Sequence, residues 1–142
     1  MTFKKTLLAT LCSFALMFAF VGVSQAQPLP EAPEAERETI ALELLKKNPN
    51  AVLIYAKGLC CQSCGIGVRK KVTQLTFVDQ TRYNAGVELH PQSQLATIAI
   101  KKKRSANGKA LGKAIDDAGY DPVNMYTLKR GKLVVASIAL KK

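Results

Sequence analysis

The chain has 142 residues, with 21 Lys and Arg against 10 Asp and Glu, which gives a formal net charge of +11 at pH 7. This length is enough for one domain. The sequence contains no Trp and no interleaving of aromatic with basic residues, so we do not expect it to bind nucleic acid. We interpret the positive charge as a solvated surface, with docking to an acidic protein or to a membrane as the alternative.

Residues 1–26 have the layout of a secretory signal peptide. Lys4 and Lys5 precede an apolar run over residues 7–23, and residues 24–26 (Ser-Gln-Ala) form a small-x-small cleavage site. We therefore expect cleavage after Ala26 and a periplasmic or secreted protein. A retained membrane anchor is the less favoured alternative, because an apolar run of about 17 residues is at the short end of what spans a bilayer.

Three cysteines remain after such a cleavage, and Cys60, Cys61 and Cys64 lie within five positions of one another. A secreted domain that depends on disulfides spreads its cysteines along the chain. The fold must therefore rest on an ordinary apolar core. Cys12 lies inside the apolar run of the predicted signal peptide, and we assign it no role.

Residues 27–50 are predicted to form a Pro-rich linker followed by an amphipathic helix over residues 34–47. Acidic residues crowd its first turn and two lysines close its last turn, which suits the helix dipole at both ends. We expect the helix to pack on the domain, and a free partner-binding helix is the alternative. Its apolar stripe consists of Ile40, Ala41, Leu44 and Leu45.

Strand and helix patterns alternate from residue 51 onward. Ser105 is the expected N-cap of the second helix of this part, and Gly119 follows its end. Residues 76–84 either begin the next strand early or lead from the preceding helix into a loop. The predicted elements are a buried strand at 51–57, a helix at 65–75, strands at 85–90 and 95–101, a helix after residue 105, and a hairpin of strands 125–128 and 133–140. The inner face of the first of these helices is expected to consist of Ile66, Val68, Val72 and Leu75.

This element order predicts an α+β fold of the ferredoxin-like βαββαβ type. One antiparallel sheet would carry two helices on one face, with an added N-terminal helix and a C-terminal strand. The domain would span residues 51–128, and residues 129–142 would form the C-terminal strand extension.

The thiols stand on the turn between the predicted strand and the predicted helix. Thiolates at a helix N-terminus are stabilised by the dipole and by the free N–H groups of the first turn. Cys61 and Cys64, with no neighbouring His, Asp or Glu, make a soft site of low coordination number that suits Cu(I) or Hg(II). Zn(II) is less suitable because it usually takes four ligands. Cys60 is a candidate third ligand, although adjacent side chains on an extended backbone usually point in opposite directions.

Residues 58–64, Gly-Leu-Cys-Cys-Gln-Ser-Cys, resemble the Gly-Met-x-Cys-x-x-Cys motif of the heavy-metal-associated domain family. This family includes copper chaperones, the N-terminal modules of metal-exporting P-type ATPases and periplasmic mercury-binding proteins. The Gly-Tyr pair that closes the family's second helix is present as Gly119-Tyr120. The resemblance covers residues 51–128, with Leu59 in place of the motif's Met and Cys60 at its variable position.

The resemblance implies a metal-binding protein rather than an enzyme, with Cys61 and Cys64 as the metal ligands. It also implies that Leu59 anchors the loop from the core and that Tyr120 shields the site; the alternative for Tyr120 is a ring packed at the end of the sheet. The expected partner is a metal-donor or metal-acceptor protein, such as a metal-transporting membrane protein. The protein would be a monomer or a metal-bridged dimer.

Two other functions remain open at this point. The first is a thiol-disulfide oxidoreductase that uses Cys61 and Cys64. The second is a structural module whose cysteines are merely oxidised. His90, the single histidine, is expected at the surface, and the basic run at residues 101–104 is expected to be solvated or to dock on an acidic partner.

Overall fold

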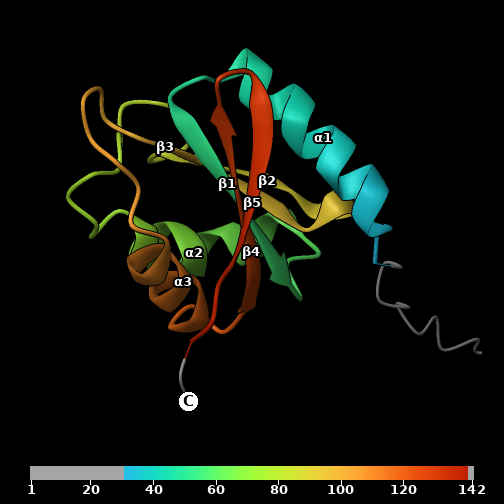
Figure 1. The fold of residues 1–142 in the computed structure, drawn as a ribbon. Coiled ribbons are helices and arrows are strands. Elements are labelled where there is room, and N and C mark those ends of the chain that lie inside the picture. Colours follow the sequence, from blue (N-terminus) through green and yellow to red (C-terminus); the bar gives the residue numbers. More distant parts are fainter. Residues whose placement is uncertain (1–30, 141–142) are drawn as a thin grey trace, which may run out of the picture.

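An antiparallel sheet of five strands organises residues 31–140, the part of the chain that the computed structural model describes (Figure 1). The strand order is β2-β3-β1-β4-β5. The sequence-based prediction of an α+β fold with one antiparallel sheet is confirmed, and the arrangement is compatible with a ferredoxin-like fold. The strands are β1 (Ala51–Lys57), β2 (Val87–His90), β3 (Leu95–Ala99), β4 (Asp121–Lys129) and β5 (Lys132–Ser137), and the helices are α1 (Glu34–Lys47), α2 (Gly65–Val72) and α3 (Gly108–Asp116).

The central strand β1 is buried on both faces, which explains its uninterrupted apolar sequence. Successive side chains of a strand point to opposite faces. Val52, Ile54 and Ala56 accordingly belong to the core on the side of α2 and α3. Leu53 and Tyr55 belong to the smaller core on the other side.

Helix α1 covers the second face of the sheet (Figure 1). Its Ala41 and Leu45 are buried against Leu53, Leu95 and Tyr126. The apolar stripe read from the sequence is therefore the packing face of α1, and α1 is not a free helix.

A buried arginine reinforces this contact. The guanidinium of Arg37 stacks 3.6 Å from the centroid of the Tyr55 ring, and its Nη2 donates a hydrogen bond to the Ala32 carbonyl. Nothing in the sequence pattern predicted that a charged residue of α1 would face the sheet.

Two helix boundaries differ from the sequence-based predictions. Helix α3 begins at Gly108 with Asn107, not Ser105, as its N-cap, because the Asn107 side chain accepts a hydrogen bond from the Ala110 N–H at 3.0 Å. Helix α2 ends at Val72 instead of residue 75, and the chain continues in tight turns whose N–H groups reach back three residues, as from Leu75 to Val72.

The strand boundaries differ for conformational reasons. Strand β2 begins at Val87, because Ala85 and Gly86 have φ angles of +53° and +84°, which interrupt an extended chain. Strand β4 begins at Asp121, earlier than predicted, because Pro122 lies beside an irregularity in the β1–β4 register where its missing N–H is tolerated. Strand β5 ends at Ser137 instead of residue 140.

One connection that the sequence left open and one predicted hairpin can now be described. Residues 76–84 form a loop that contributes only isolated bridges, from Val78 to Ile100 and from Asn84 to Val87. Strands β4 and β5 form the predicted hairpin, whose tip, Arg130 and Gly131, has the two positive φ angles of a type I′ turn.

The predicted signal peptide, residues 1–26, and the start of the predicted linker lie outside the described residues. Within residues 31–140, no helix combines the length and the apolar character needed to cross a membrane.

Candidate functional site: a cluster of three cysteines

The three cysteines gather at the end of the sheet where β1 passes into α2. The Sγ atoms of Cys60, Cys61 and Cys64 all lie within 4.8 Å of one another, and no His, Asp or Glu belongs to the group. The adjacency of Cys60 and Cys61 therefore does not carry the Cys60 sulfur away from the others, in contrast to what an extended backbone suggested. The three thiols form a group that can hold a metal ion.

Two of these cysteines are paired with each other. Cys61 and Cys64 form a disulfide, with Cα atoms 5.4 Å apart, and Cys60 is a free, exposed thiol. The Cys61 sulfur also lies 3.1 Å from the Ser63 hydroxyl oxygen. Because metal ligation needs thiolates, the cluster has two chemical states: a disulfide with one spare thiol, and a reduced trithiol.

Residues from the β2–β3 hairpin hold the thiol loop in place. Gly58, with a φ of +86°, donates its N–H to Oε1 of the buried Gln94 at 3.2 Å. The Gln62 side-chain amide donates to the Leu89 carbonyl at 3.3 Å. These two contacts fix both halves of the loop. Sequence reasoning missed them, because nothing in a local pattern links residues 94 and 89 to the loop.

Leu59 is the one buried side chain among residues 58–64. It is fully enclosed in the core beneath α2 and α3, together with Val68 and Leu111. The apolar position that the motif places below the thiols is therefore occupied by Leu59.

Tyr120 lies directly beside the thiol loop. Its hydroxyl donates to the Cys64 carbonyl at 3.4 Å, and its ring stands 3.7 Å from the position of a Cβ built on Gly58. The same ring is half-buried against the main core. The two placements that the sequence suggested for the Tyr120 ring therefore do not exclude each other. The ring packs at the end of the sheet and also touches the loop.

The first turn of α2 follows the cysteines immediately, and Cys64 is its N-cap residue. The dipole and the free N–H groups of that turn stabilise negative charge on nearby sulfur. Lys57 ends β1 just before the loop and pairs across the sheet with Asp121, so the charges beside the thiols are mixed in sign.

Ile66 corrects a sequence-based prediction. It was assigned to the inner face of the helix, but 71% of its surface is exposed, whereas Val68 and Val72 are buried. Residues two positions apart on a helix point in nearly opposite directions, so Ile66 and Val68 cannot both face the core. The structure therefore presents an apolar side chain to solvent two residues after Cys64.

His90 is not part of the cysteine cluster. Its Nε2 lies 2.9 Å from the Thr97 hydroxyl oxygen, and partial burial lowers the pKa of its imidazole. The prediction of a surface histidine is therefore wrong, because the His90 side chain is partly buried.

The basic run Lys101–Arg104 is exposed, as expected, and lies away from the thiols.

No protein-family model matches this chain. No curated protein matches it significantly. The resemblance to heavy-metal-associated domains consequently rests on the motif at residues 58–64, the Gly119-Tyr120 pair and the order of helices and strands.

Proposed function

We propose that the reduced protein binds a thiophilic ion through Cys61 and Cys64 and passes it to another protein by ligand exchange. Cu(I) is the favoured ion and Hg(II) the second choice. The observation that carries this proposal is the convergence of three sulfurs within 4.8 Å, with no oxygen or nitrogen ligand in the group. Soft ions prefer such a site. The site does not offer the four ligands that Zn(II) usually takes.

Exposure of the loop supports transfer rather than storage. Cys60, Gln62 and Ser63 are exposed, so an incoming thiolate has access to an ion held by Cys61 and Cys64. An ion with only two or three sulfur ligands can accept the new sulfur before it releases an old one. Cys60 is placed to be the third ligand, because its sulfur is already beside the other two.

The partner in this proposal is a metal donor or acceptor, such as a metal-transporting membrane protein. Ile66 gives it an apolar contact next to the thiols. The sequence-based expectation of export places the exchange in the periplasm or outside the cell, and the protein acts as a carrier, not as an enzyme. Before it binds an ion, the Cys61–Cys64 disulfide must accept two electrons and two protons from a thiol reductant.

Titration of the reduced and the oxidised protein with Cu(I), Hg(II) and Zn(II), against a competing chelator and without oxygen, tests the proposal. The reduced form should bind one Cu(I) or Hg(II) tightly and Zn(II) weakly. The oxidised form, identical in sequence, should bind none tightly because its two main ligands are bonded to each other. A reduced form that binds no better than the oxidised form would exclude the carrier function.

A second function is favoured by one specific observation, the disulfide between Cys61 and Cys64. A thiol-disulfide oxidoreductase would transfer this disulfide to a substrate dithiol through a mixed disulfide, with reduction of the Cys61–Cys64 pair. Disulfide reductase or isomerase turnover by the same sample, together with weak metal binding, would favour this function over the carrier.

Tyr120 tests whether the aromatic ring beside the loop affects the bound ion. We expect Tyr120→Ala to lower the affinity for Cu(I) about tenfold and to speed its release to a chelator, because outer-shell contacts typically contribute 10–100-fold. Tyr120→Phe keeps the ring and loses only the hydrogen bond to the Cys64 carbonyl, so it measures how much of that loss is due to the hydrogen bond. Unchanged affinity and release in the Ala variant would reduce Tyr120 to a packing residue.

A further inference from the structure

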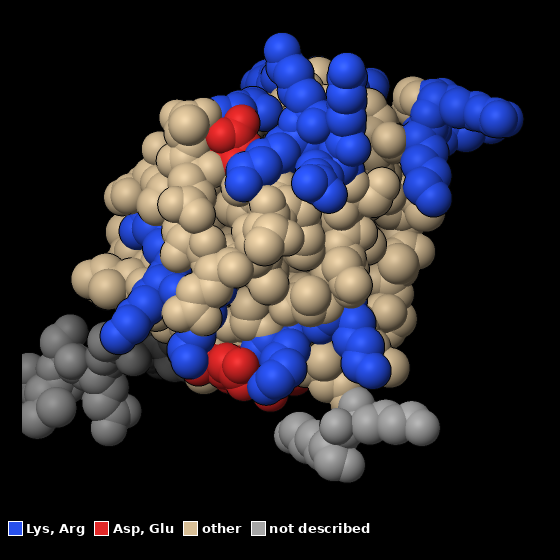
Figure 2. Space-filling model, turned by 90° about the vertical axis from the view of Figure 1, so that its left-hand side faces the viewer, with Lys and Arg blue, Asp and Glu red and all other residues tan. Residues whose placement is uncertain are grey.

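Three segments bring their positive charges together at the end of the sheet opposite the thiol loop. They are the C-terminus of α1, the β3–α3 connection and the β4–β5 hairpin, and Figure 2 shows basic side chains gathered at this end. Lys101, Lys103, Arg104 and Lys129 line one hollow there. We call this surface the basic end; its nine residues, all exposed, are Lys46, Lys47, Lys101, Lys102, Lys103, Arg104, Lys129, Arg130 and Lys132.

The basic end accounts for the whole positive excess of the described chain. Residues 31–140 contain 17 Lys and Arg and 10 Asp and Glu, so the eight cations outside the basic end are outnumbered by the acidic residues. The ion pairs found in residues 31–140 are Arg37–Glu31 and Lys113–Asp117, and neither involves the basic end. Its charges are therefore available to an external partner.

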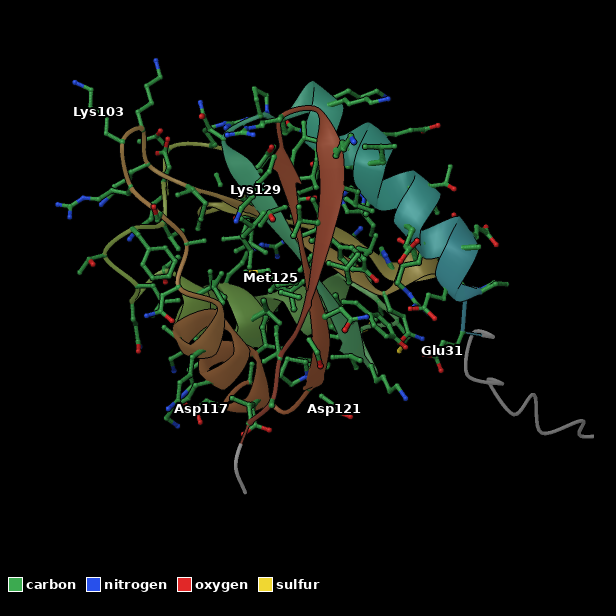
Figure 3. All side chains as sticks on the ribbon, in the orientation of Figure 1. Glu31, Lys103, Asp117, Asp121, Met125 and Lys129 are labelled. Carbon is green, nitrogen blue, oxygen red and sulfur yellow. A yellow bond between two sulfur atoms is a disulfide. The ribbon has the colours of Figure 1, made fainter. Side chains whose placement is uncertain are left out.

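Several acidic residues lie toward the other end of the molecule, whereas Asp79 lies near Lys101 of the basic end. Figure 3 places Lys103 and Lys129 at the top, and Glu31, Asp117 and Asp121 at the bottom. Asp121 lies opposite Lys57 in the register of β1 and β4, and Lys57 leads into the thiol loop. The domain is thus polarised along β1, with cations at one end and thiols at the other.

We propose that the basic end docks the domain on an anionic membrane surface. Protein interfaces usually have an apolar core, but the large apolar residues exposed in the described chain are Ile66 on α2 and Val135 in the middle of β5, neither at the basic end. Lipid headgroups require only clustered, accessible cations. The basic end meets that requirement and offers no such apolar anchor to a protein.

Docking in this way would leave the cysteines free. The seven residues of β1 span roughly 20 Å at about 3.3 Å per residue and separate the basic end from the thiol loop. The loop would face the aqueous phase, where an exchange partner can reach it. This inference goes beyond the proposed metal binding and does not depend on it.

Sedimentation with vesicles tests the proposal. The protein should bind vesicles of phosphatidylglycerol and phosphatidylcholine in equal parts at low salt, should dissociate as salt is added, and should not bind pure phosphatidylcholine. A Lys47→Gln/Lys102→Gln/Lys132→Gln variant takes one cation from each segment. Each loss should lower the partition coefficient about fivefold, so the triple variant should bind about a hundredfold more weakly.

The matched control is Lys57→Gln/Lys70→Gln/Lys109→Gln, which removes the same charge from exposed positions elsewhere. This control variant should retain most of the vesicle binding. An equal loss in both variants would show that only the net charge matters and would overturn the assignment of docking to the basic end. Binding to poly-glutamate without binding to anionic vesicles would reassign the surface to an acidic protein. In the vesicle-bound state, Cys60 should still react with a bulky maleimide; protection of Cys60 would overturn the orientation.

Discussion

The Cys61→Ser/Cys64→Ser variant should lose high-affinity binding of Cu(I) and Hg(II). Two of the three sulfurs in the cluster are removed, and a single exposed thiol, Cys60, remains. The loss should exceed the roughly 100-fold effect of removing an outer-shell partner, since the ligands themselves are gone. Competition with a chelator of known affinity measures it. The fold should be retained, because both positions are only partly buried on a surface loop.

The Cys60→Ser variant is the matched control for this experiment. It removes one thiol from the same loop and leaves the Cys61–Cys64 pair intact. Binding should survive and weaken only to the extent that Cys60 supplies a third sulfur. If Cys60→Ser abolished binding as completely as the double variant, the assignment of Cys61 and Cys64 as the main ligands would be wrong.

Arsenic(III) compounds can show how many of the three sulfurs bind the same arsenic atom. Arsenite forms up to three As–S bonds with release of water, whereas phenylarsine oxide has two valences available for thiols. The reduced wild type should bind both, because its three sulfurs lie within 4.8 Å. Cys60→Ser should keep phenylarsine oxide and lose most of its affinity for arsenite. Equal retention of both compounds would mean that Cys60 takes no part in the site.

The sequence was most informative where a local pattern determines the structure. An uninterrupted apolar strand predicted β1, and the spacing of apolar residues predicted α1 together with the face that packs on the sheet. The position of the cysteines between a strand and a helix was also correct. These features depend on residues that are close in the chain, so periodicity reveals them.

Features that depend on tertiary context were missed. The burial of Arg37 is possible because the Tyr55 ring of another element receives its guanidinium. The thiol loop is tied to Gln94, which is distant in sequence. Pairing of Cys61 with Cys64, and the approach of Cys60 to both, depend on the loop conformation that such distant contacts fix. Spacing alone identified the thiols but not their chemical state.

Leu59→Ala should be the most destabilising substitution in the thiol loop. Leu59 is fully buried, and truncation of a buried leucine to alanine costs about 2–5 kcal/mol through lost burial and the cavity left behind. In a domain of this size we expect the melting temperature of the oxidised protein to fall by about 10–20 °C. Thermal unfolding followed by circular dichroism measures the change.

The same substitution should weaken the site at temperatures where the domain is still folded. Leu59 lies between Gly58 and Cys60 and is the one fully buried side chain of the loop, so its loss frees the sulfurs to spread apart. Leu59→Met is the matched control, because a swap of similar volume usually costs less than about 1.5 kcal/mol. It should preserve both stability and Cu(I) affinity. A Leu59→Ala protein with normal stability and unchanged affinity would show that the hydrogen bonds of Gly58 and Gln62 hold the loop, and that Leu59 does not anchor it.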